Sequence, residues 1–271
     1  MQRKELMTGS GTVVYWMTEP IDHTKDTMFL LHGLTADHTM FDAQTEYFRK
    51  DYNVIAWDAP AHGESRPFHG FTYRIAADCV KQILDDNGIA EAILIGQSMG
   101  GFISQSVLGL YPECVKAFVS IDSTPYGDYY SRSDQWWLRQ VEWMAMLYPL
   151  KMLKSAMAKQ TAVTEKGREN MKAMLAPYGK KELCHLMGIG FAGFLDNNKE
   201  LEITCPVLLI VGENDKTGKV LSYNKEWTKR TGFPLIYIRN AGHNANVDRP
   251  KEVNKAMEEF LENNCFLNTL G

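Results

Sequence analysis

Short runs of apolar residues recur along the first 122 residues of this chain. Three of them cover residues 28–31, 54–57 and 92–95, and this near-continuous apolar pattern is typical of strands that are covered on both faces. Residues 73–87 and 101–110 have apolar positions at helical spacing. The alternation predicts the α/β class, with a mostly parallel central sheet and helices on both of its faces.

The flanking segments extend this pattern. Apolar and polar residues alternate over residues 5–18, on either side of Gly9-Ser10-Gly11. This pattern predicts an antiparallel hairpin at a sheet edge. A fourth apolar run covers residues 117–121, two more buried strands are expected at 207–211 and 235–238, and an amphipathic helix is expected at 251–263.

The stretch between residues 123 and 204 has helical character and no comparable strand. We therefore expect residues 1–122 and 205–271 to form the core, and residues 123–204, called the cap segment below, to be an inserted helical cap.

Composition narrows the class of protein. Hydrophobic residues make up 45% and charged residues 23% of the 271 residues, which is ordinary for a globular domain with a real core. Lys and Arg total 29 against 33 Asp and Glu, for a formal net charge of -4. No positive field is available to concentrate a polyanion, so nucleic acid is not an expected partner.

The cysteines and the N-terminus bear on location. Five cysteines occur without a CxxC pair, and an odd number in this pattern is typical of reduced, buried thiols. Residues 1–5 do not begin a basic and then apolar leader, and no run is long enough to span a membrane. We expect a cytoplasmic protein with no membrane partner; the oligomeric state is not indicated.

The clearest chemical signal is Gly-Gln-Ser-Met-Gly-Gly at residues 96–101, between an expected strand and an expected helix. A turn of this kind places Ser98 in a strained backbone and exposes its hydroxyl, while glycines on either side relieve crowding. The helix that follows directs its positive end at the same place. A glycine-rich helix start without chemistry is the alternative, but neither GxGxxG nor GxxxxGK[ST] matches a phosphate loop.

A serine nucleophile needs a base, which a third group orients. His243 follows the last expected strand and Asp215 follows the strand before it, so both are expected at the sheet edge where Ser98 lies. The chain order Ser98, Asp215, His243 is typical of hydrolases with a nucleophile elbow. Asp122 also follows a strand and is a second candidate for the acid; we favour Asp215.

The turn His32-Gly33-Leu34 follows the strand at residues 28–31. Acyl transfer places negative charge on an oxygen, which backbone N–H groups stabilise. Leu34 and Met99 are the candidates for these donors, whereas His32 is expected to be a buried, hydrogen-bonded residue. No HxH or HExxH spacing occurs, so no metal site is predicted. The nearest histidines, His62 and His69, are expected in an exposed loop.

These motifs resemble those of the α/β-hydrolase family along nearly the whole chain. The matching residues are His32-Gly33, Asp58-Ala59-Pro60-Ala61-His62-Gly63-Glu64-Ser65, Gly96-Gln97-Ser98-Met99-Gly100-Gly101, Asp215 and Gly242-His243. The resemblance implies a Ser-His-Asp triad and a helical cap after the sixth strand. Ala61 and Phe41 depart from the family pattern, which often has Gly and Trp there. Ser98 argues against relatives with an Asp nucleophile, such as haloalkane dehalogenases and epoxide hydrolases.

The cap segment is rich in tryptophan and methionine, which form adaptable apolar walls. Trp136 and Trp137 are the candidate substrate-binding residues, and the remaining members of the set are Trp143, Met144, Met146, Met152, Met157, Met171, Met174 and Met187. Ordinary helix packing is the alternative role for each of them. If they form a pocket, the substrate is a small molecule with an apolar group.

The sequence thus predicts a cofactor-independent serine hydrolase that cleaves a carboxylic ester, thioester or lactone through an acyl-enzyme on Ser98. The resemblance also admits C–C bond hydrolases, lyases and cofactor-free peroxidase-like enzymes with the same triad. A non-catalytic ligand-binding module on the same scaffold is a further alternative, because fold alone does not fix function.

Overall fold

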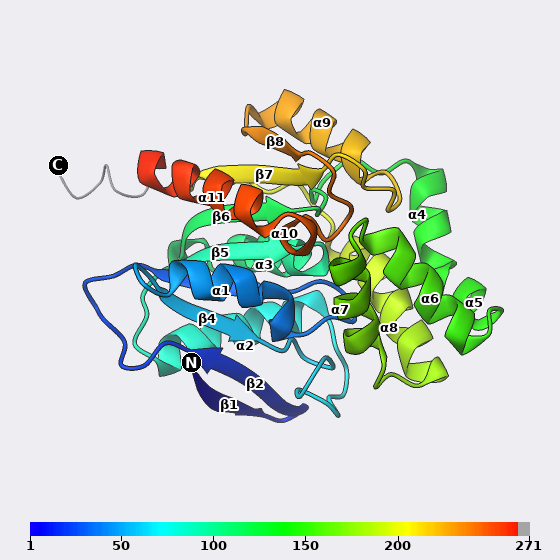
Figure 1. Cartoon of the computed structure of the whole chain (residues 1–271), viewed down its shortest axis with the longest axis horizontal. Helices are drawn as coiled ribbons and strands as arrows, with labels where there is room; N and C mark the ends of the chain where they lie inside the picture. Colours follow the sequence, from blue (N-terminus) through cyan, green and yellow to red (C-terminus); the bar gives the residue numbers. More distant parts are fainter. Residues whose placement is uncertain (265–271) are drawn as a thin grey trace.

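A computed structural model describes residues 1–264 of the chain. An eight-stranded sheet forms the centre of the protein (Figure 1). The strand order is β1-β2-β4-β3-β5-β6-β7-β8. The strands are β1 Gln2–Thr8, β2 Gly11–Met17, β3 Thr27–Leu31, β4 Asn53–Trp57, β5 Ala92–Gln97, β6 Val115–Ile121, β7 Val207–Gly212 and β8 Leu235–Ile238.

The first two strands pair in an antiparallel hairpin at one edge of the sheet, and β2 joins β4 in antiparallel fashion. All remaining pairs are parallel. The register places the carboxyl ends of neighbouring strands level, with Gln97 opposite Ile121 and Ile121 opposite Ile210. The loops that leave β5, β6 and β7 therefore begin at one edge of the sheet.

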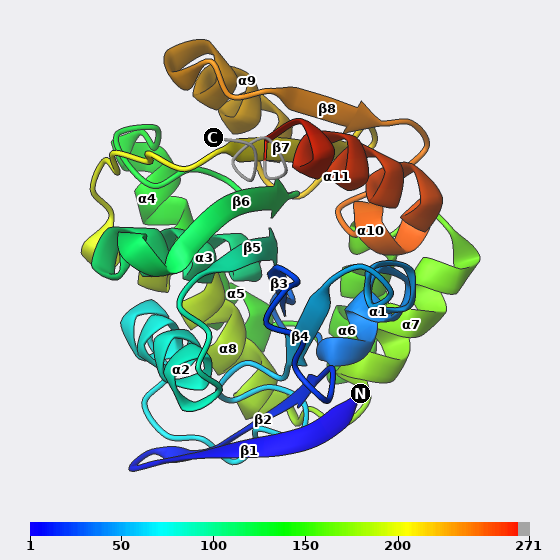
Figure 2. The same cartoon turned by 90° about the vertical axis from the view of Figure 1, so that its left-hand side faces the viewer.

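Helices cover both faces of the sheet (Figure 2). Alternate strand residues point to opposite faces, so Phe29 packs with one core cluster and Leu30 with the other. The first cluster includes residues of α2 (Tyr73–Asp86), α3 (Met99–Leu110) and α9 (Val220–Thr231), and the second includes residues of α1 (Asp42–Phe48) and α11 (Pro250–Asn264). The predicted α/β class, with a mostly parallel sheet between two helical layers, is confirmed.

The cap segment contains helices and no strand. Its helices are α4 Arg132–Arg139, α5 Val141–Met146, α6 Leu150–Thr161, α7 Glu165–Leu175, α8 Lys180–Ala192 and the 3-10 helix η3 Gly193–Asn197. Figure 1 shows α4 to α8 gathered at the end of the molecule toward which the parallel strands point. They lie beyond the carboxyl edge, and the division into core and cap stays a prediction.

The burial of β8 and of the cysteines differs in part from the expectation. Residues 235–238 form the expected strand, but it is not buried: Leu235 and Ile236 are half-buried and Tyr237 is 42% exposed. The reason is position, since β8 ends the sheet and pairs with β7 alone. Cys79, Cys114 and Cys184 are buried as expected, Cys205 is only partly buried, and Cys265 lies outside the described residues.

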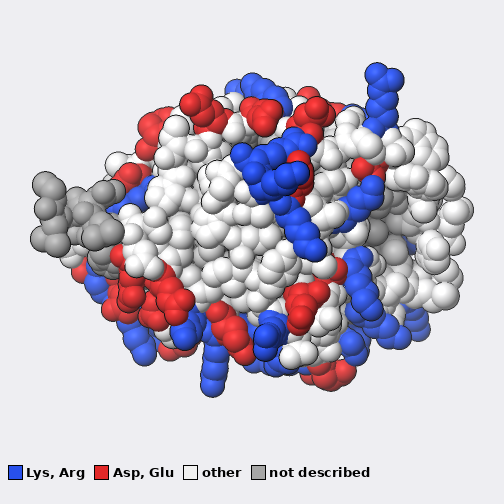
Figure 3. Space-filling model, turned by 90° about the horizontal axis from the view of Figure 1, so that it is seen from above, with Lys and Arg blue, Asp and Glu red and all other residues white. Residues whose placement is uncertain are grey.

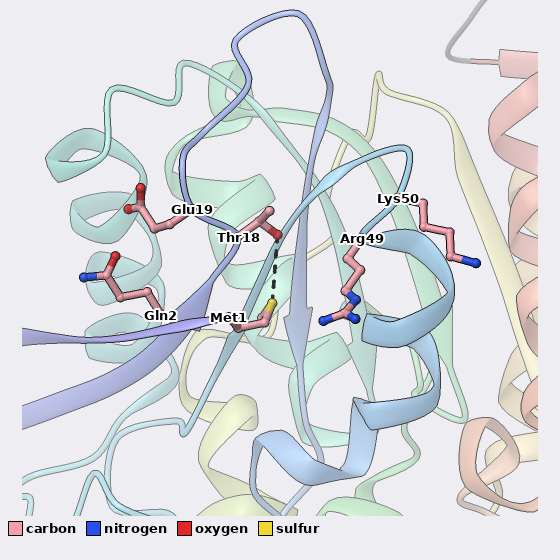
Figure 4. Close-up of a pocket in the computed structure, with 6 residues that line it drawn as sticks. All are labelled: Met1, Gln2, Thr18, Glu19, Arg49 and Lys50. Carbon is pink, nitrogen blue, oxygen red and sulfur yellow. Dashed lines mark hydrogen bonds between the residues drawn. The ribbon is translucent and has the colours of Figure 1, made fainter.

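Within residues 1–264, no helix is both long and apolar enough to cross a membrane. A surface hollow of about 420 Å³ lies between the N-terminus and the end of α1 (Figure 4). Met1, Thr18 and Arg49 line it, and the Thr18 hydroxyl contacts the Met1 sulfur at 3.9 Å. None of the predicted site residues lines this hollow, so it is not the candidate site.

Candidate active site

Ser98 occupies the sharp turn between β5 and α3. Its backbone has φ 48° and ψ -112°, a conformation that costs energy for a residue with a side chain. Close backbone contacts enforce the turn: a Cβ atom on Gly96 would lie 2.4 Å from the Gly100 carbonyl oxygen, and one on Gly100 would lie 1.9 Å from the Leu31 oxygen. The two glycines therefore let α3 begin directly against the sheet, with its N-terminal end at Ser98.

The structure brings Ser98, His243 and Asp215 into one hydrogen-bonded chain. His243 Nε2 lies 2.9 Å from Ser98 Oγ, and His243 Nδ1 lies 2.8 Å from Asp215 Oδ2. Burial of His243 disfavours its charged form, but the neighbouring Asp215 carboxylate outweighs burial and raises the His243 pKa above its ordinary value. The imidazole is thus oriented by a carboxylate on one side and directed at a hydroxyl on the other.

Asp122 lies in the same region but does not contact the imidazole through a hydrogen bond. Its Oδ1 accepts the Gly212 N–H at 2.6 Å, and its Oδ2 accepts the Ala245 N–H at 3.0 Å. Burial, and then repulsion from Asp215, raises the Asp122 pKa well above its ordinary value. Through its two hydrogen bonds, the Asp122 side chain joins the start of the loop that carries Asp215 to the loop that carries His243.

The two candidate oxyanion donors lie beside the elbow. A Cβ on Gly33 would come within 3.4 Å of the Ser98 Cβ, which places the turn that carries Leu34 against the serine. Met99 is the first residue of α3. Within residues 1–264, the backbone N–H groups of Leu34 and Met99 donate no hydrogen bond, so both remain available to a bound oxygen.

Gln97 is a site residue that the sequence analysis missed. Its side-chain Nε2 donates to the His243 carbonyl oxygen at 2.7 Å, so the elbow strand holds the histidine loop directly. The side chain is buried and lines the cavity. Its position next to Ser98 was the available signal, but the sequence does not tell toward which loop the amide points.

An apolar cavity of about 620 Å³ opens above Ser98 and His243. The cap segment supplies much of its wall, including Trp137, Met144, Met157, Met171, Met187 and Phe191. Trp136 is not among the residues that line it and is 54% exposed. The expectation of two substrate-facing tryptophans is therefore corrected for Trp136, because consecutive residues on a helix point about 100° apart.

The remaining tryptophan and methionine side chains of the cap segment do not line the cavity either. Met174 is buried away from the cavity, whereas Trp143, Met146 and Met152 are exposed to solvent. The predicted apolar wall is thus formed by part of the set only. The exposed side chains lie on a different surface of the cap segment.

The histidines near the turn after β4 are structural. His32 is buried, as expected, and its Nε2 accepts the Ala59 N–H at 2.9 Å. The expectation that His62 is exposed is wrong: it is fully buried, which lowers its pKa to about 3 and keeps it neutral. Its neighbours are polar or small, and for that reason the sequence suggested an exposed loop; His69 is exposed.

Asp58 organises this turn. Its carboxylate accepts the backbone N–H groups of His38 at 2.8 Å and Glu64 at 2.6 Å, and also contacts the His38 ring at 2.8 Å. Asp37, His38 and Asp58 are close enough together to suggest a metal site, but these hydrogen bonds already use the Asp58 oxygens. Ala61 has φ 67°, a left-handed conformation in which a glycine would be less strained.

Comparisons with known proteins agree with this architecture. Residues 26–151 match the family model described as alpha/beta hydrolase fold. The chain is 28% identical to human "Epoxide hydrolase 4" over 269 residues, covering 88% of this chain and 73% of that protein. It is 24% identical over 245 residues to a 2-(acetamidomethylene)succinate hydrolase of Mesorhizobium japonicum, covering 87% of each.

A solved structure shares the fold at lower identity. The thermophilic esterase from Thermogutta terrifontis superimposes with a TM-score of 0.76 at 21% identity, covering 97% of this chain and 99% of that one. The family-model match, the hydrolase relatives and the shared sheet-and-helix architecture agree with one another. This chain is therefore an enzyme with the alpha/beta hydrolase fold.

Proposed function

We propose that the protein is a serine hydrolase that cleaves a carboxylic ester, thioester or lactone through an acyl-enzyme on Ser98. The observation that carries the proposal is the hydrogen-bonded chain from Asp215 through His243 to Ser98 at the mouth of an apolar cavity. A hydroxyl becomes an effective nucleophile when an adjacent base accepts its proton as it attacks.

In the first half of the reaction, Ser98 Oγ attacks the substrate carbonyl carbon while His243 Nε2 takes the serine proton. The negative charge on the former carbonyl oxygen is held by the N–H groups of Leu34 and Met99, together with the N-terminal end of α3. As the carbonyl re-forms, the bond to the leaving group breaks and His243 returns the proton to that group. The products are the released alcohol or thiol and an acyl-Ser98 ester; a lactone's alcohol stays joined to the acyl group.

In the second half, water replaces the alcohol. His243 Nε2 takes a proton from water as the oxygen attacks the acyl carbon, and then gives it to Ser98 as the ester bond breaks. Asp215 keeps the imidazole in the tautomer that presents Nε2 to both nucleophiles. Nothing in this sequence of steps requires a cofactor.

The cavity supports a small substrate with an apolar group. The wall above the serine is formed largely by methionine and aromatic side chains, including Met157, Met187 and Phe191, which adapt to an acyl or alcohol chain. Their flexibility suits chains of more than one shape. We propose that this group lies against Trp137 while the carbonyl reaches Ser98.

The alternative functions differ in whether they need a reactive serine. The named activity of the human relative is epoxide hydrolysis, but relatives of that kind use an Asp nucleophile and this chain has Ser98. C–C bond hydrolysis, lyase chemistry and cofactor-free peroxidase-like chemistry all retain the triad. A ligand-binding module needs no activated serine, so reactivity of Ser98 separates it from the enzymes.

The direct test is incubation of the folded protein with a fluorophosphonate, followed by intact mass measurement. We expect rapid addition of one label to the wild type and to Ser123→Ala, a neighbouring serine that lines the same cavity, and none to Ser98→Ala. A panel of p-nitrophenyl esters of graded acyl length, with lactones and C–C substrates, then identifies the reaction.

Ser98→Ala should lower kcat on any active ester about a millionfold, as loss of a triad serine does, with an unchanged circular dichroism spectrum. Near wild-type turnover by this variant would exclude Ser98 as nucleophile. Labelling at Ser98 without ester or lactone turnover would direct the search to the other triad chemistries.

A further inference from the structure

Among residues 1–264, the large apolar side chains that are exposed are concentrated in one short part of the cap segment. Six of them occur between residues 136 and 152 outside the cavity wall. We call them the docking face: Trp136, Trp143, Met146, Leu147, Tyr148 and Met152. Trp143 is 53% exposed and Leu147 is 70% exposed. Single exposed apolar residues are normal, whereas several exposed ones in one short helical stretch are a candidate interaction surface.

Helical geometry shows that the docking face is distinct from the cavity wall. Gln140 and Leu147 have right-handed helical backbone angles, so α4 and α5 follow one another in nearly continuous helical steps. Trp136, Trp143 and Leu147 recur at spacings of seven and four and share the outward side. Trp137, Val141 and Met144, displaced by one residue or more, line the cavity.

A surface helix that packs on a core needs one apolar stripe. The segment formed by α4 and α5 has two apolar stripes. One of them faces the cavity and α8, and the other faces outward. Packing inside the described chain therefore does not explain Trp136, Trp143 and Leu147. The outward stripe is therefore accessible to an apolar partner outside this molecule.

The charges around the docking face indicate what kind of partner fits. Residues 132–161 contain five Lys or Arg and two Asp or Glu, although the whole chain has a formal net charge of -4. Of the two acidic side chains, Asp134 pairs with Lys219 at 2.6 Å and Glu142 contacts His185 at 3.4 Å; of the five basic ones, Arg139 pairs with Asp196 at 3.3 Å. The local charge is therefore opposite in sign to that of the chain as a whole.

Basic side chains lie next to the apolar ones. Arg132 is exposed and precedes Trp136 by one helical turn, and Lys151 is exposed beside Met152. The Lys180 ammonium donates to the carbonyl oxygens of Ala145 and Tyr148, at the end of α5. Figure 3 shows a broad surface without charged residues at the cap end of the molecule, with Lys and Arg at its margins.

We propose that the docking face binds the surface of an anionic lipid bilayer. Tryptophan and tyrosine are suited to the boundary between water and lipid, because each has an apolar ring and one polar atom. Exposed apolar side chains insert among the acyl chains while Lys and Arg contact anionic headgroups. The sequence predicted no membrane partner because it contains neither an expected leader nor a run long enough to span a membrane; neither signal bears on binding at a bilayer surface.

The position of the docking face also relates it to the cavity. Trp137 is 56% exposed and lines the cavity as well, so the cavity wall continues into the surface that carries Trp136. A bilayer bound to the docking face would lie next to this end of the cavity. Binding itself does not depend on Ser98 or on the proposed hydrolysis.

Vesicle co-sedimentation tests the proposal. The wild type and Ser98→Ala are mixed with vesicles of phosphatidylcholine alone or of equimolar phosphatidylcholine and phosphatidylserine. We expect both proteins to sediment with the mixed vesicles, to bind neutral vesicles less, and to be released by high salt. Quenching of tryptophan emission by brominated phosphatidylcholine is expected in the bound state. Wild-type protein that stays in the supernatant, or is not quenched, would overturn the proposal.

The matched variants are Trp143→Ser with Leu147→Ser, and Met7→Ser with Tyr237→Ser as control. Both pairs remove exposed apolar side chains, but Met7 and Tyr237 lie on the edge strands. The first pair should lower the partition coefficient at least about tenfold and the control pair should not. Circular dichroism checks that both are folded.

Equal binding by the wild type and a folded Trp143/Leu147 variant would exclude the docking face. A protein surface is the alternative occupant. If light scattering finds that the wild type is a dimer and that this variant is a monomer, the face is a subunit interface and the lipid proposal is wrong.

Discussion

The carboxyl edge of the sheet and the cap segment face the same cavity but are held in different ways. At the sheet edge, Asp122, Asp215 and His243 are buried, and each has a hydrogen-bond partner on another loop or strand. In the cap segment, the cavity-facing Trp137 is 56% exposed and the wall consists mainly of apolar contacts. The fixed region is suited to the bond-making chemistry, and the adaptable region to selecting the substrate.

The contrast extends to how each region tolerates change. The loops of the sheet edge are linked by Asp122, whose two oxygens serve different loops, and by Gln97, which contacts the His243 loop. Removing Asp122 leaves buried N–H donors without a partner, and removing Gln97 deprives the His243 carbonyl oxygen of its donor. In the cap segment, removing a methionine or tryptophan changes cavity shape and leaves the hydrogen bonds of the triad in place.

The sharpest test at the sheet edge compares its two carboxylates. We expect Asp215→Asn to lower kcat by about 10⁴, the loss that follows when a triad imidazole loses its orienting carboxylate in a serine protease. Asp122→Asn should reduce kcat only mildly, because Asp122 does not bond to the imidazole. Rates on one ester, at the same pH and with equal folded fractions, check the ranking.

Stability provides the control for this pair. An Asn at position 122 keeps one acceptor oxygen but directs its NH₂ group toward the N–H of Gly212 or Ala245, so the free energy of unfolding should fall by about 1–3 kcal/mol. The opposite ranking of kcat values, with Asp122→Asn the more severe, would assign the acid role to Asp122.

The sequence predicted the sheet edge well because its signals are local. Continuous apolar runs mark buried parallel strands, and the residue that follows such a strand must lie at its carboxyl end. Ser98, Asp215 and His243 are therefore placed by their own neighbours in the sequence. The order of strands is not local, and for that reason β8 was expected to be buried although it is the edge strand.

The cap segment was predicted less well for a physical reason. Its helices are apolar on two sides, and the pattern alone does not tell which side faces the cavity. Trp136 and Trp137 are adjacent and have the same composition around them, yet only Trp137 lines the cavity. His62 shows the same limit in the core, since its ring packs not only against the nearby Phe71 but also against Tyr178, which is distant in the sequence.

The adjacent residues Trp136 and Trp137 test whether the cavity-facing side of the cap segment selects the substrate. Trp137→Ala should change the ratio of kcat/KM between long and short acyl esters by about tenfold, because contact with an apolar group in a pocket is worth that much. Trp136→Ala should leave the ratio unchanged, since Trp136 is outside the cavity. Kinetics on the graded p-nitrophenyl panel measure both.

Thermal midpoints separate selectivity from packing in these variants. A fall in midpoint for Trp137→Ala with an unchanged chain-length preference would show that Trp137 only packs the cap helices. A changed preference in Trp136→Ala would place Trp136 in the substrate path after all.

The smallest expected effect concerns pH and again separates the two regions. As the proposed base, His243 can accept a proton only when it is neutral. The pKa of His243 is raised because the attraction of Asp215, together with a weaker one from Asp122, outweighs burial. The acid limb of kcat/KM should therefore have its midpoint above the ordinary value of about 6.5 for histidine. Activity is lost as the pH falls through that midpoint, because protonation removes the base.

Replacing either carboxylate weakens the attraction that favours the imidazolium, so the midpoint should move to lower pH. The shift should be larger for Asp215→Asn than for Asp122→Asn, because Asp215 also bonds to the imidazole. Trp137→Ala should not move it, since no charge near His243 changes. A limb that shifts with the cap variant, or one that stays fixed in Asp215→Asn, would mean that a group other than His243 sets the acid limb.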